Sequence, residues 1–321
     1  MNFKRRLYRG LANFYPNKYK NLLAKELVYG GEKTHVDYWL GASFVLGFFV
    51  LLAVLLVPWA FFRDYNYGFI ALAILGFLLM HFVVYMAIYY KQKDRTERIE
   101  NALPDMLQLV ASNLRAGMTP YHSLKLAARE EFGPLKEEIE YATTRALGIE
   151  NFGDSLLRIK DHVKSGMLDR ALKLLTSSLK AGGKLANVLE HLSFDMAETR
   201  ELKRELLTNT KSYSMFIMFT VILGGPLLLG ISYQFLAMVT DLYASTSVDG
   251  GGLISSIAIT PEFFSNFAVG FLLITSILAS SLMGTISEGD YKYGLRNFPL
   301  IFVGSVILFF VVRYLVGNVF L

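Results

Sequence analysis

Cysteine is absent from the 321 residues, and charged residues are scarce, at 18% of the chain. A typical soluble domain has about 25% charged residues. The missing thiols exclude disulfides, cysteine-ligated zinc, iron–sulfur clusters and thiol catalysis. The scarcity of charge, together with 53% hydrophobic residues, predicts that a large part of the chain lies outside water.

Asp, Glu and Lys are also missing from five long hydrophobic stretches, in which only Arg313 and His81 interrupt the apolar pattern. Each stretch reaches the length of about 20 residues that an α-helix needs to cross a bilayer. No apolar signal-peptide core precedes the first stretch, so we expect it to be retained as an anchor. The five predicted transmembrane helices are residues 38–62, 67–90, 213–239, 263–286 and 298–321.

Positive charge is distributed unevenly along the chain. Of the 32 Lys and Arg residues, eight lie in 1–37, 20 in 91–211 and two in 287–297, whereas the loop 240–262 has none. Because positive residues stay on the cytoplasmic side, we expect a multi-pass protein of the inner (cytoplasmic) membrane. Its N-terminus and residues 91–211 would lie inside and its C-terminus outside. The near balance of 20 basic and 18 acidic residues in 91–211 argues against a nucleic-acid partner.

Composition divides the chain into four predicted parts. Residues 1–37 form a basic N-terminal segment, 38–90 hold the first two transmembrane helices, 91–211 form a cytoplasmic helical domain, and 212–321 hold the last three transmembrane helices. Within the first part, residues 3–15 place apolar side chains at helical spacing among basic ones. This pattern predicts an amphipathic helix on the inner leaflet of the lipid bilayer; a solvated basic tail is the alternative.

Turn residues divide 91–211 into helices. Pro104 marks the expected start of one helix and Gly117 its end, while Thr119 and Pro120 supply the N-cap and first position of the next. Asn151 is expected to cap a later helix. Alternation with a period of two is absent, so we predict six helices joined by short turns.

A shift of 65 residues aligns 107–117 with 172–182, with six identities in eleven positions. Both segments end in a basic residue, Ala and Gly. The match predicts a duplicated unit; two amphipathic helices that share leucine spacing are the alternative. The predicted fold is an all-α membrane protein with five transmembrane helices and a six-helix cytoplasmic bundle made of two pseudo-repeated three-helix units.

Glycine and proline are missing from residues 77–103 and 184–223. A continuous helix over the second run would measure about 60 Å at 1.5 Å per residue. Such helices would join the cytoplasmic domain to the second and third transmembrane helices as rigid rods. A bend at 209–212 is the alternative for the second run.

Catalytic motifs are absent from the sequence. The triplet Gly182, Gly183, Lys184 suggests a phosphate-binding loop, but Ser178 stands where that motif needs glycine and Leu185 where it needs Ser or Thr. The five histidines are scattered singly, which predicts no metal site. We therefore expect no catalytic, cofactor-binding or metal-binding residues, and a protein that is not an enzyme.

The isolated basic side chains have simple expected roles. His81 is expected to stay neutral and to bond a tyrosine or a backbone carbonyl. Arg313, eight residues before the end of its stretch, is expected to extend towards the outer headgroups. His162 is expected on a solvated helix face. Because the five stretches hold no carboxylate, the sequence argues against an ion-coupled transporter.

Small residues mark two places in the predicted transmembrane helices. Ser276, Ser280 and Gly284 lie four apart on one helix face, a spacing that lets helices approach closely in lipid. The sequence Gly224-Gly225-Pro226 is expected to kink or loosen its helix. Both features predict packing within the bundle or between protomers.

Four short motifs stand out in the cytoplasmic segment, at residues 103–105, 115–119, 132–135 and 180–189. They resemble motifs of the type II secretion system F family, the inner-membrane platform proteins of type II secretion, type IV pili, tight-adherence pili and archaeal flagella. Larger members carry two cytoplasmic domains, whereas this chain has one, as in the short tight-adherence and archaeal forms.

The resemblance implies a platform that couples a cytoplasmic secretion or pilus ATPase to pilin subunits leaving the membrane. A single domain implies a homo-oligomer or a sister platform subunit. An alternative function is a membrane receptor or scaffold that relays a signal through its helical domain, although the loop 240–262 is short for a sensor. The candidate ATPase-facing residues, whose glycines could instead be helix caps, are Arg115, Gly117, Lys180, Gly182, Gly183 and Lys184.

Overall fold

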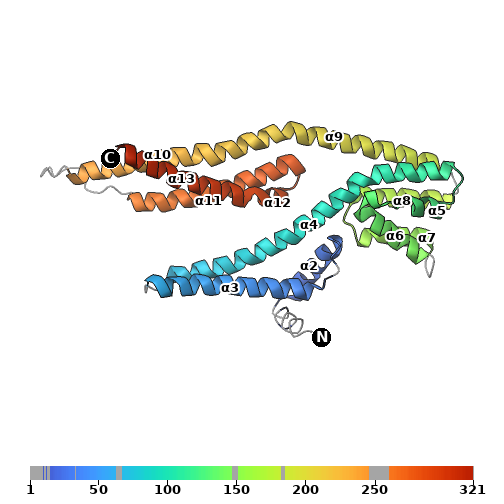
Figure 1. The fold of residues 1–321 in the computed structure, drawn as a ribbon, viewed down its shortest axis with the longest axis horizontal. Helices are drawn as coiled ribbons and strands as arrows, with labels where there is room; N and C mark the ends of the chain where they lie inside the picture. The colour runs from blue at the N-terminus through green and yellow to red at the C-terminus, as the bar shows by residue number, and fades with distance from the viewer. Residues whose placement is uncertain are drawn as a thin grey trace. The chain divides into compact units, whose positions relative to one another are not determined.

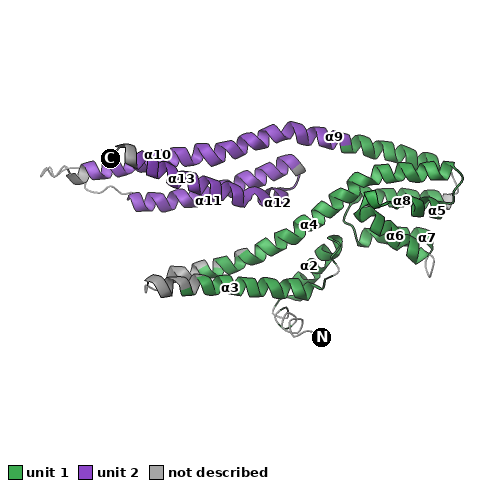
Figure 2. Ribbon diagram, in the orientation of Figure 1, with its two compact units in different colours: residues 1–200 green, residues 201–321 purple. Residues whose placement is uncertain are grey.

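The computed structural model describes residues 10, 12, 15–32, 34–62, 67–146, 151–181, 185–245 and 260–320, and every regular element among them is helical. This confirms the predicted all-α class. The chain divides into two compact units, residues 1–200 and 201–321 (Figure 2). The predicted amphipathic helix at residues 3–15 falls almost wholly outside the described residues.

The first unit contains the helices from the N-terminus to the start of α9 (Figure 1). One of them, α2, was not predicted from the sequence. The elements are α2 (Asn17–Tyr29), α3 (Val36–Phe62), α4 (Tyr67–Arg115), α5 (Pro120–Ala127), the 3₁₀ turn η1 (Glu130–Phe132), α6 (Pro134–Ala146), α7 (Phe152–Leu157), the 3₁₀ turn η2 (Arg158–Asp161), α8 (Gly166–Ala181) and α9 (Leu185–Phe219).

Helix α4 runs without interruption for 49 residues, about 74 Å at 1.5 Å per residue. Its first half packs along α3, and its second half packs among the short helices that follow (Figure 1). The predicted rod over 77–103 is therefore confirmed. The predicted helix start at Pro104 is wrong, because Pro104 lies inside α4. Buried Leu103 and Leu107 hold the helix in place on both sides of the proline, which offsets its missing hydrogen bond.

One hydrophobic core joins the second half of α4 to α5, α6, α7, α8 and the start of α9. Six pairs of its buried residues are separated by 65 positions, as the repeat predicts. The repeat aligns α4 and α5 with α8 and α9. Under the same 65-residue shift, α6 aligns with the interior of α9 and not with a separate third helix. Two complete three-helix units therefore remain a prediction. The pairs are Leu103/Leu168, Met106/Ala171, Leu107/Leu172, Val110/Leu175, Leu124/Leu189 and Ala127/Leu192.

The predicted N-caps stand at the starts of their helices. Thr119 caps α5 by accepting a hydrogen bond from the N–H of His122 at 3.4 Å. Asn151 caps α7 by accepting one from the N–H of Gly153, also at 3.4 Å. These side chains satisfy N–H groups that the first helical turn leaves without partners.

The second unit begins within α9 and continues through the remaining helices. A π-helical turn, Thr220–Gly224, lies between α9 and the next helix at the predicted Gly224-Gly225-Pro226 site. Because Pro226 has no N–H to donate, the regular ladder is interrupted there. The elements after this turn are α10 (Gly225–Ser245), α11 (Pro261–Glu288), α12 (Tyr291–Gly294), the 3₁₀ turn η4 (Leu295–Asn297) and α13 (Phe298–Phe320).

Four helical stretches among the described residues are long and apolar enough to cross a membrane, which identifies a multi-pass membrane protein. The predicted stretch 67–90 forms the first half of α4 but is not one of the four, so the five-helix layout remains a prediction. The four stretches are Val36–Ala53, Leu185–Leu242, Pro261–Ser287 and Tyr291–Gly317.

The stripe of small residues on α11 lies inside the second unit. Ser276 and Ser280 are fully buried. A Cβ atom on Gly284 would overlap the backbone of Gly294 in α12, and one on Gly294 would overlap the carbonyl oxygen of Ser280. The missing side chains therefore let α11 and α12 meet backbone to backbone.

We predict that Gly284→Ala lowers the free energy of unfolding in detergent by about 1–3 kcal/mol, since the added methyl group meets backbone atoms that cannot rotate away. Gly270→Ala on the same helix is the matched control, because a Cβ there meets nothing within 4 Å. The control should be neutral or slightly stabilising through helix propensity. Equal thermal midpoints for the two variants would contradict the tight packing.

Candidate functional site

The turn between α4 and α5 carries two of the predicted partner-facing residues, Arg115 and Gly117. The N–H of Gly117 donates to the carbonyl of Leu114 at 3.0 Å, and that of Met118 donates to the carbonyl of Asn113 at 3.2 Å. This is the Schellman arrangement, which ends a helix at a residue with a left-handed backbone. Gly117 has φ +88°. Gly117 therefore acts as the C-terminal cap of α4, and this structural role does not depend on a partner.

Arg115 forms an ion pair with Glu190 of α9. Its Nη1 donates to both carboxylate oxygens at 2.8 Å. The two side chains are 49% and 30% exposed, and an exposed pair adds only about 0–1 kcal/mol to stability. The pair places the end of α4 beside the first turns of α9 and leaves much of the Arg115 side chain open to a partner.

The other predicted partner-facing residues lie at the edge of the described part of the chain. Gly182, Gly183 and Lys184 fall outside it, as does the side chain of Lys180, whose backbone belongs to α8. Helix α9 begins directly after this segment, and Arg115 contacts that helix. A common surface formed by the two glycine turns remains a prediction.

A charged groove lies between α4 and the turn around η1, with a volume of about 790 Å³. Arg200 of α9 donates to the carbonyl of Asn101 at 2.7 Å and to the carboxylate of Asp105 at 3.0 Å, and both acceptor residues line the groove. This groove was not predicted from the sequence. The lining residues are Arg98, Asn101, Ala102, Asp105, Leu109, Arg129, Glu131, Phe132, Gly133 and Pro134.

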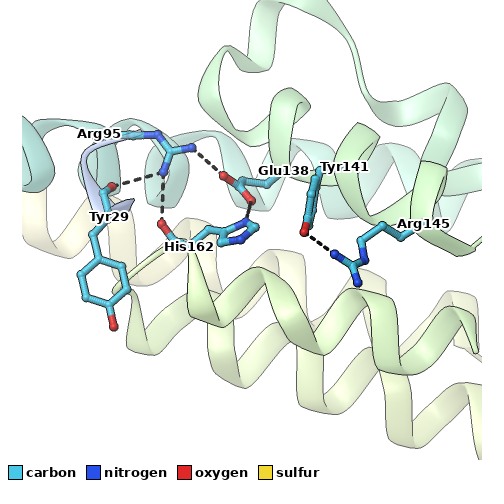
Figure 3. A network of polar contacts seen from close by, with 6 residues as sticks. All are labelled: Tyr29, Arg95, Glu138, Tyr141, Arg145 and His162. Carbon is cyan, nitrogen blue, oxygen red and sulfur yellow. Dashed lines mark hydrogen bonds and ion pairs between the residues drawn. The ribbon is translucent and has the colours of Figure 1, made fainter. Parts of the chain in front are cut away.

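A buried network centred on Arg95 joins α4 to α2, α6 and the residue after η2 (Figure 3). Arg95 donates to the carboxylate of Glu138 at 2.6 Å. It also donates to the carbonyls of Tyr29 at 3.2 Å and His162 at 3.3 Å. His162 Nδ1 lies 3.1 Å from the second carboxylate oxygen of Glu138. Four segments that are distant in sequence thus meet at one guanidinium group.

The solvated face expected at His162 is confirmed only in part, because the His162 side chain is 32% exposed. Its ring contacts Glu138 and packs edge-on against Tyr141, with 4.8 Å between ring centroids. Nothing in the sequence distinguished Arg95, Glu138 and His162 from other charged helix residues, because their pairing depends on the tertiary fold. Among the described residues, no group of three His, Asp or Glu side chains could hold a metal ion.

Further polar contacts attach the α2 region to the same part of α4. Gly31 has φ +72°, and a Cβ atom there would lie 2.6 Å from Nε of Arg95, so the position accepts only glycine without rearrangement. Glu32 bonds Lys91, and this hydrogen bond lowers the pKa of the Glu32 carboxyl group. The apolar side of the contact is a cluster from α2, α3 and α4 that includes Leu27.

The two basic residues of the predicted transmembrane helices have defined contacts. His81 bonds the carbonyl of Phe77 at 2.9 Å and the hydroxyl of Tyr15, as its expected role required. The expected reach of Arg313 towards the outer headgroups stays a prediction. Its guanidinium stacks on the ring of Tyr233, 4.1 Å from the centroid, and donates to the hydroxyl of Ser265 at 3.3 Å.

Residues 106–232 match the family model of the type II secretion system protein F. The chain is also similar to an uncharacterized protein of Methanocaldococcus jannaschii, with 23% identity over 277 residues. That match covers 84% of this chain and 44% of the relative, so the chain spans less than half of the relative's length. No solved structure matches the chain.

We predict that Arg95→Met destabilises the first unit by about 3–5 kcal/mol, because removing one partner of a buried ion pair leaves the carboxylate of Glu138 buried without its cation. Arg98→Met is the matched control, since the exposed pair of Arg98 with Asp94 contributes little. Thermal unfolding in detergent measures both. The double variant Arg95→Met/Glu138→Leu should recover part of the loss, and equal effects of the two single variants would contradict a buried pair.

Proposed function

Since residues 106–232 form a type II secretion system protein F domain, we propose that this chain is a non-enzymatic platform protein that couples a cytoplasmic ATPase to pilin-like subunits leaving the membrane. The family match supports a component of a secretion or pilus machine. The name of the Methanocaldococcus jannaschii relative states no activity. Coupling to an ATPase and extraction of pilin-like subunits are therefore our own proposal.

The observation that carries the proposal is the continuity of α4. One helix runs from a hydrophobic stretch beside α3 into the core of the helical domain. An α-helix without a flexible interruption transmits a displacement along its axis, and the Arg95 network prevents α6 and α2 from sliding along it. Movement imposed on the helical domain would therefore reach the hydrophobic stretch. No bond chemistry is required of this chain.

The proposed ATPase-binding surface is the α4–α5 turn with the segment before α9. Arg115 is the described charged group there, and Lys180 and Lys184 would add two positive charges. Under the predicted orientation this surface lies in the cytoplasm, where ATP is available. We propose that a second copy of this domain, from the same chain type or from a sister subunit, completes the platform.

We predict that Arg115→Glu and Lys180→Glu each weaken co-purification of the secretion ATPase with the full-length protein at least tenfold and abolish filament assembly. Lys173→Glu serves as the control for charge reversal, because Lys173 is exposed and its ion-pair partner among the described residues is Asp169, four positions earlier on the same helix. It should leave both readouts unchanged.

The swap Arg115→Glu/Glu190→Arg separates partner binding from local structure. It keeps an ion pair at the end of α4, so a purely structural role would be rescued, whereas a partner contact made by Arg115 would stay broken. Unchanged ATPase capture by both single variants would refute this surface. Capture of a signalling kinase in place of an ATPase would favour the receptor or scaffold function.

A further inference from the structure

Arg313 of α13 is a cation whose described partners are all neutral. Its guanidinium contacts the ring of Tyr233 and the hydroxyl of Ser265, while its own backbone carbonyl accepts a hydrogen bond from Nε2 of Gln234 at 2.5 Å. No carboxylate of the described chain lies within ion-pair distance of it. The residue belongs to one of the helical stretches that can cross a membrane.

Placing a charged side chain within the bilayer costs free energy, and such a side chain is usually paired with an opposite charge. Stacking on the tyrosine ring and one hydroxyl contact offset part of the desolvation cost of the guanidinium. Neither neutralises the charge. The site therefore favours a ligand that brings a negative charge to Arg313.

The surface beside Arg313 is hollowed and mostly apolar. Two adjoining hollows of about 350 Å³ and 490 Å³ share Gln234, Ala237 and Gly317. Several large hydrophobic side chains line them and remain more than half exposed within this chain. These are Ile231, Phe235, Met238 and Tyr314. Together the hollows form one groove along α10 and α13, which we call the α10–α13 groove.

The ends of the α10–α13 groove carry opposite charges. Arg313 lies at the level of Tyr233, and Asp241 lines the other end, eight residues further along α10 or about 12 Å. In the predicted orientation Asp241 is the nearer of the two to the outer surface. The negative charge of Asp241 disfavours the approach of a phospholipid phosphate from that surface to Arg313. A carboxylate on a membrane-spanning helix can lie at the depth of Arg313.

We propose that the α10–α13 groove binds an apolar transmembrane helix that carries one carboxylate, with Arg313 as the counter-ion of that carboxylate. The apolar lining takes the helix side chains, and the absence of a side chain at Gly317 lets Gln234 lie across the groove, where a Cβ atom would come within 2.6 Å of its Nε2. This inference concerns a ligand class, and it stands whether or not an ATPase is the cytoplasmic partner.

The test uses the full-length protein in phosphatidylcholine nanodiscs and two fluorescent Leu/Ala peptides of transmembrane length. One peptide carries Glu in its outer half at the depth of Arg313, and the other carries Gln at the same position. Energy transfer to the labelled protein measures binding. The expected result is at least tenfold tighter binding of the Glu peptide, because only this peptide brings a counter-ion.

Arg313→Gln should abolish the preference for the Glu peptide, and Arg313→Lys should keep most of it. Arg296→Gln is the control, since Arg296 stacks on Tyr293 outside the groove. Ala237→Trp, which fills both hollows, should weaken the binding of both peptides and provides a test if Arg313→Gln fails to fold.

Equal binding of the two peptides to the unmodified protein would overturn the proposal. So would loss of the preference on addition of phosphatidylglycerol at low mole fraction, which would assign Arg313 to lipid.

Discussion

The buried contact between Arg95 and Glu138 is the constraint on which the first unit depends. It lies midway along α4, where the helix leaves α3 and enters the hydrophobic core of the helical domain. Because a guanidinium buried to this degree must be paired, α2, α6 and His162 are held at one point of α4. The long helix and the domain around it therefore form a single mechanical body, as the proposed coupling requires.

The second unit is stabilised by a different interaction, because lipid gives little hydrophobic drive for helices to associate. Close packing at small residues takes the place of the hydrophobic effect: Gly284 and Gly294 bring α11 and α12 into backbone contact. The π-helical turn at Thr220–Gly224 relaxes the ladder before Pro226 without ending the helical run. The described partners of Arg313 in this unit are the ring of Tyr233 and the hydroxyl of Ser265, and both are neutral.

Local features were predictable from the sequence, and distant pairings were not. The cap at Gly117 and the N-cap at Thr119 follow from backbone requirements of single turns, and the 65-residue repeat anticipated the shared core. Pro104 was misplaced because packing on both sides of α4 outweighs a lost hydrogen bond. Arg95 and Glu138 were missed because 43 residues separate them and only the fold brings them together. The predicted surface at Gly117 could be located, whereas its second half falls outside the described residues.

The rigidity of α4 can be measured directly, since the absence of native cysteine allows spin labels at chosen sites. Labels on cysteines introduced at Phe82 and Gln108, both exposed on α4, would be 26 residues apart, or about 39 Å along a continuous helix. Pulsed electron paramagnetic resonance should give one narrow distance distribution near this value. The distribution should not change when the ATPase and nucleotide are added. A broad or two-peaked distribution, or a shift on ATPase binding, would show a hinge in α4 and contradict the account.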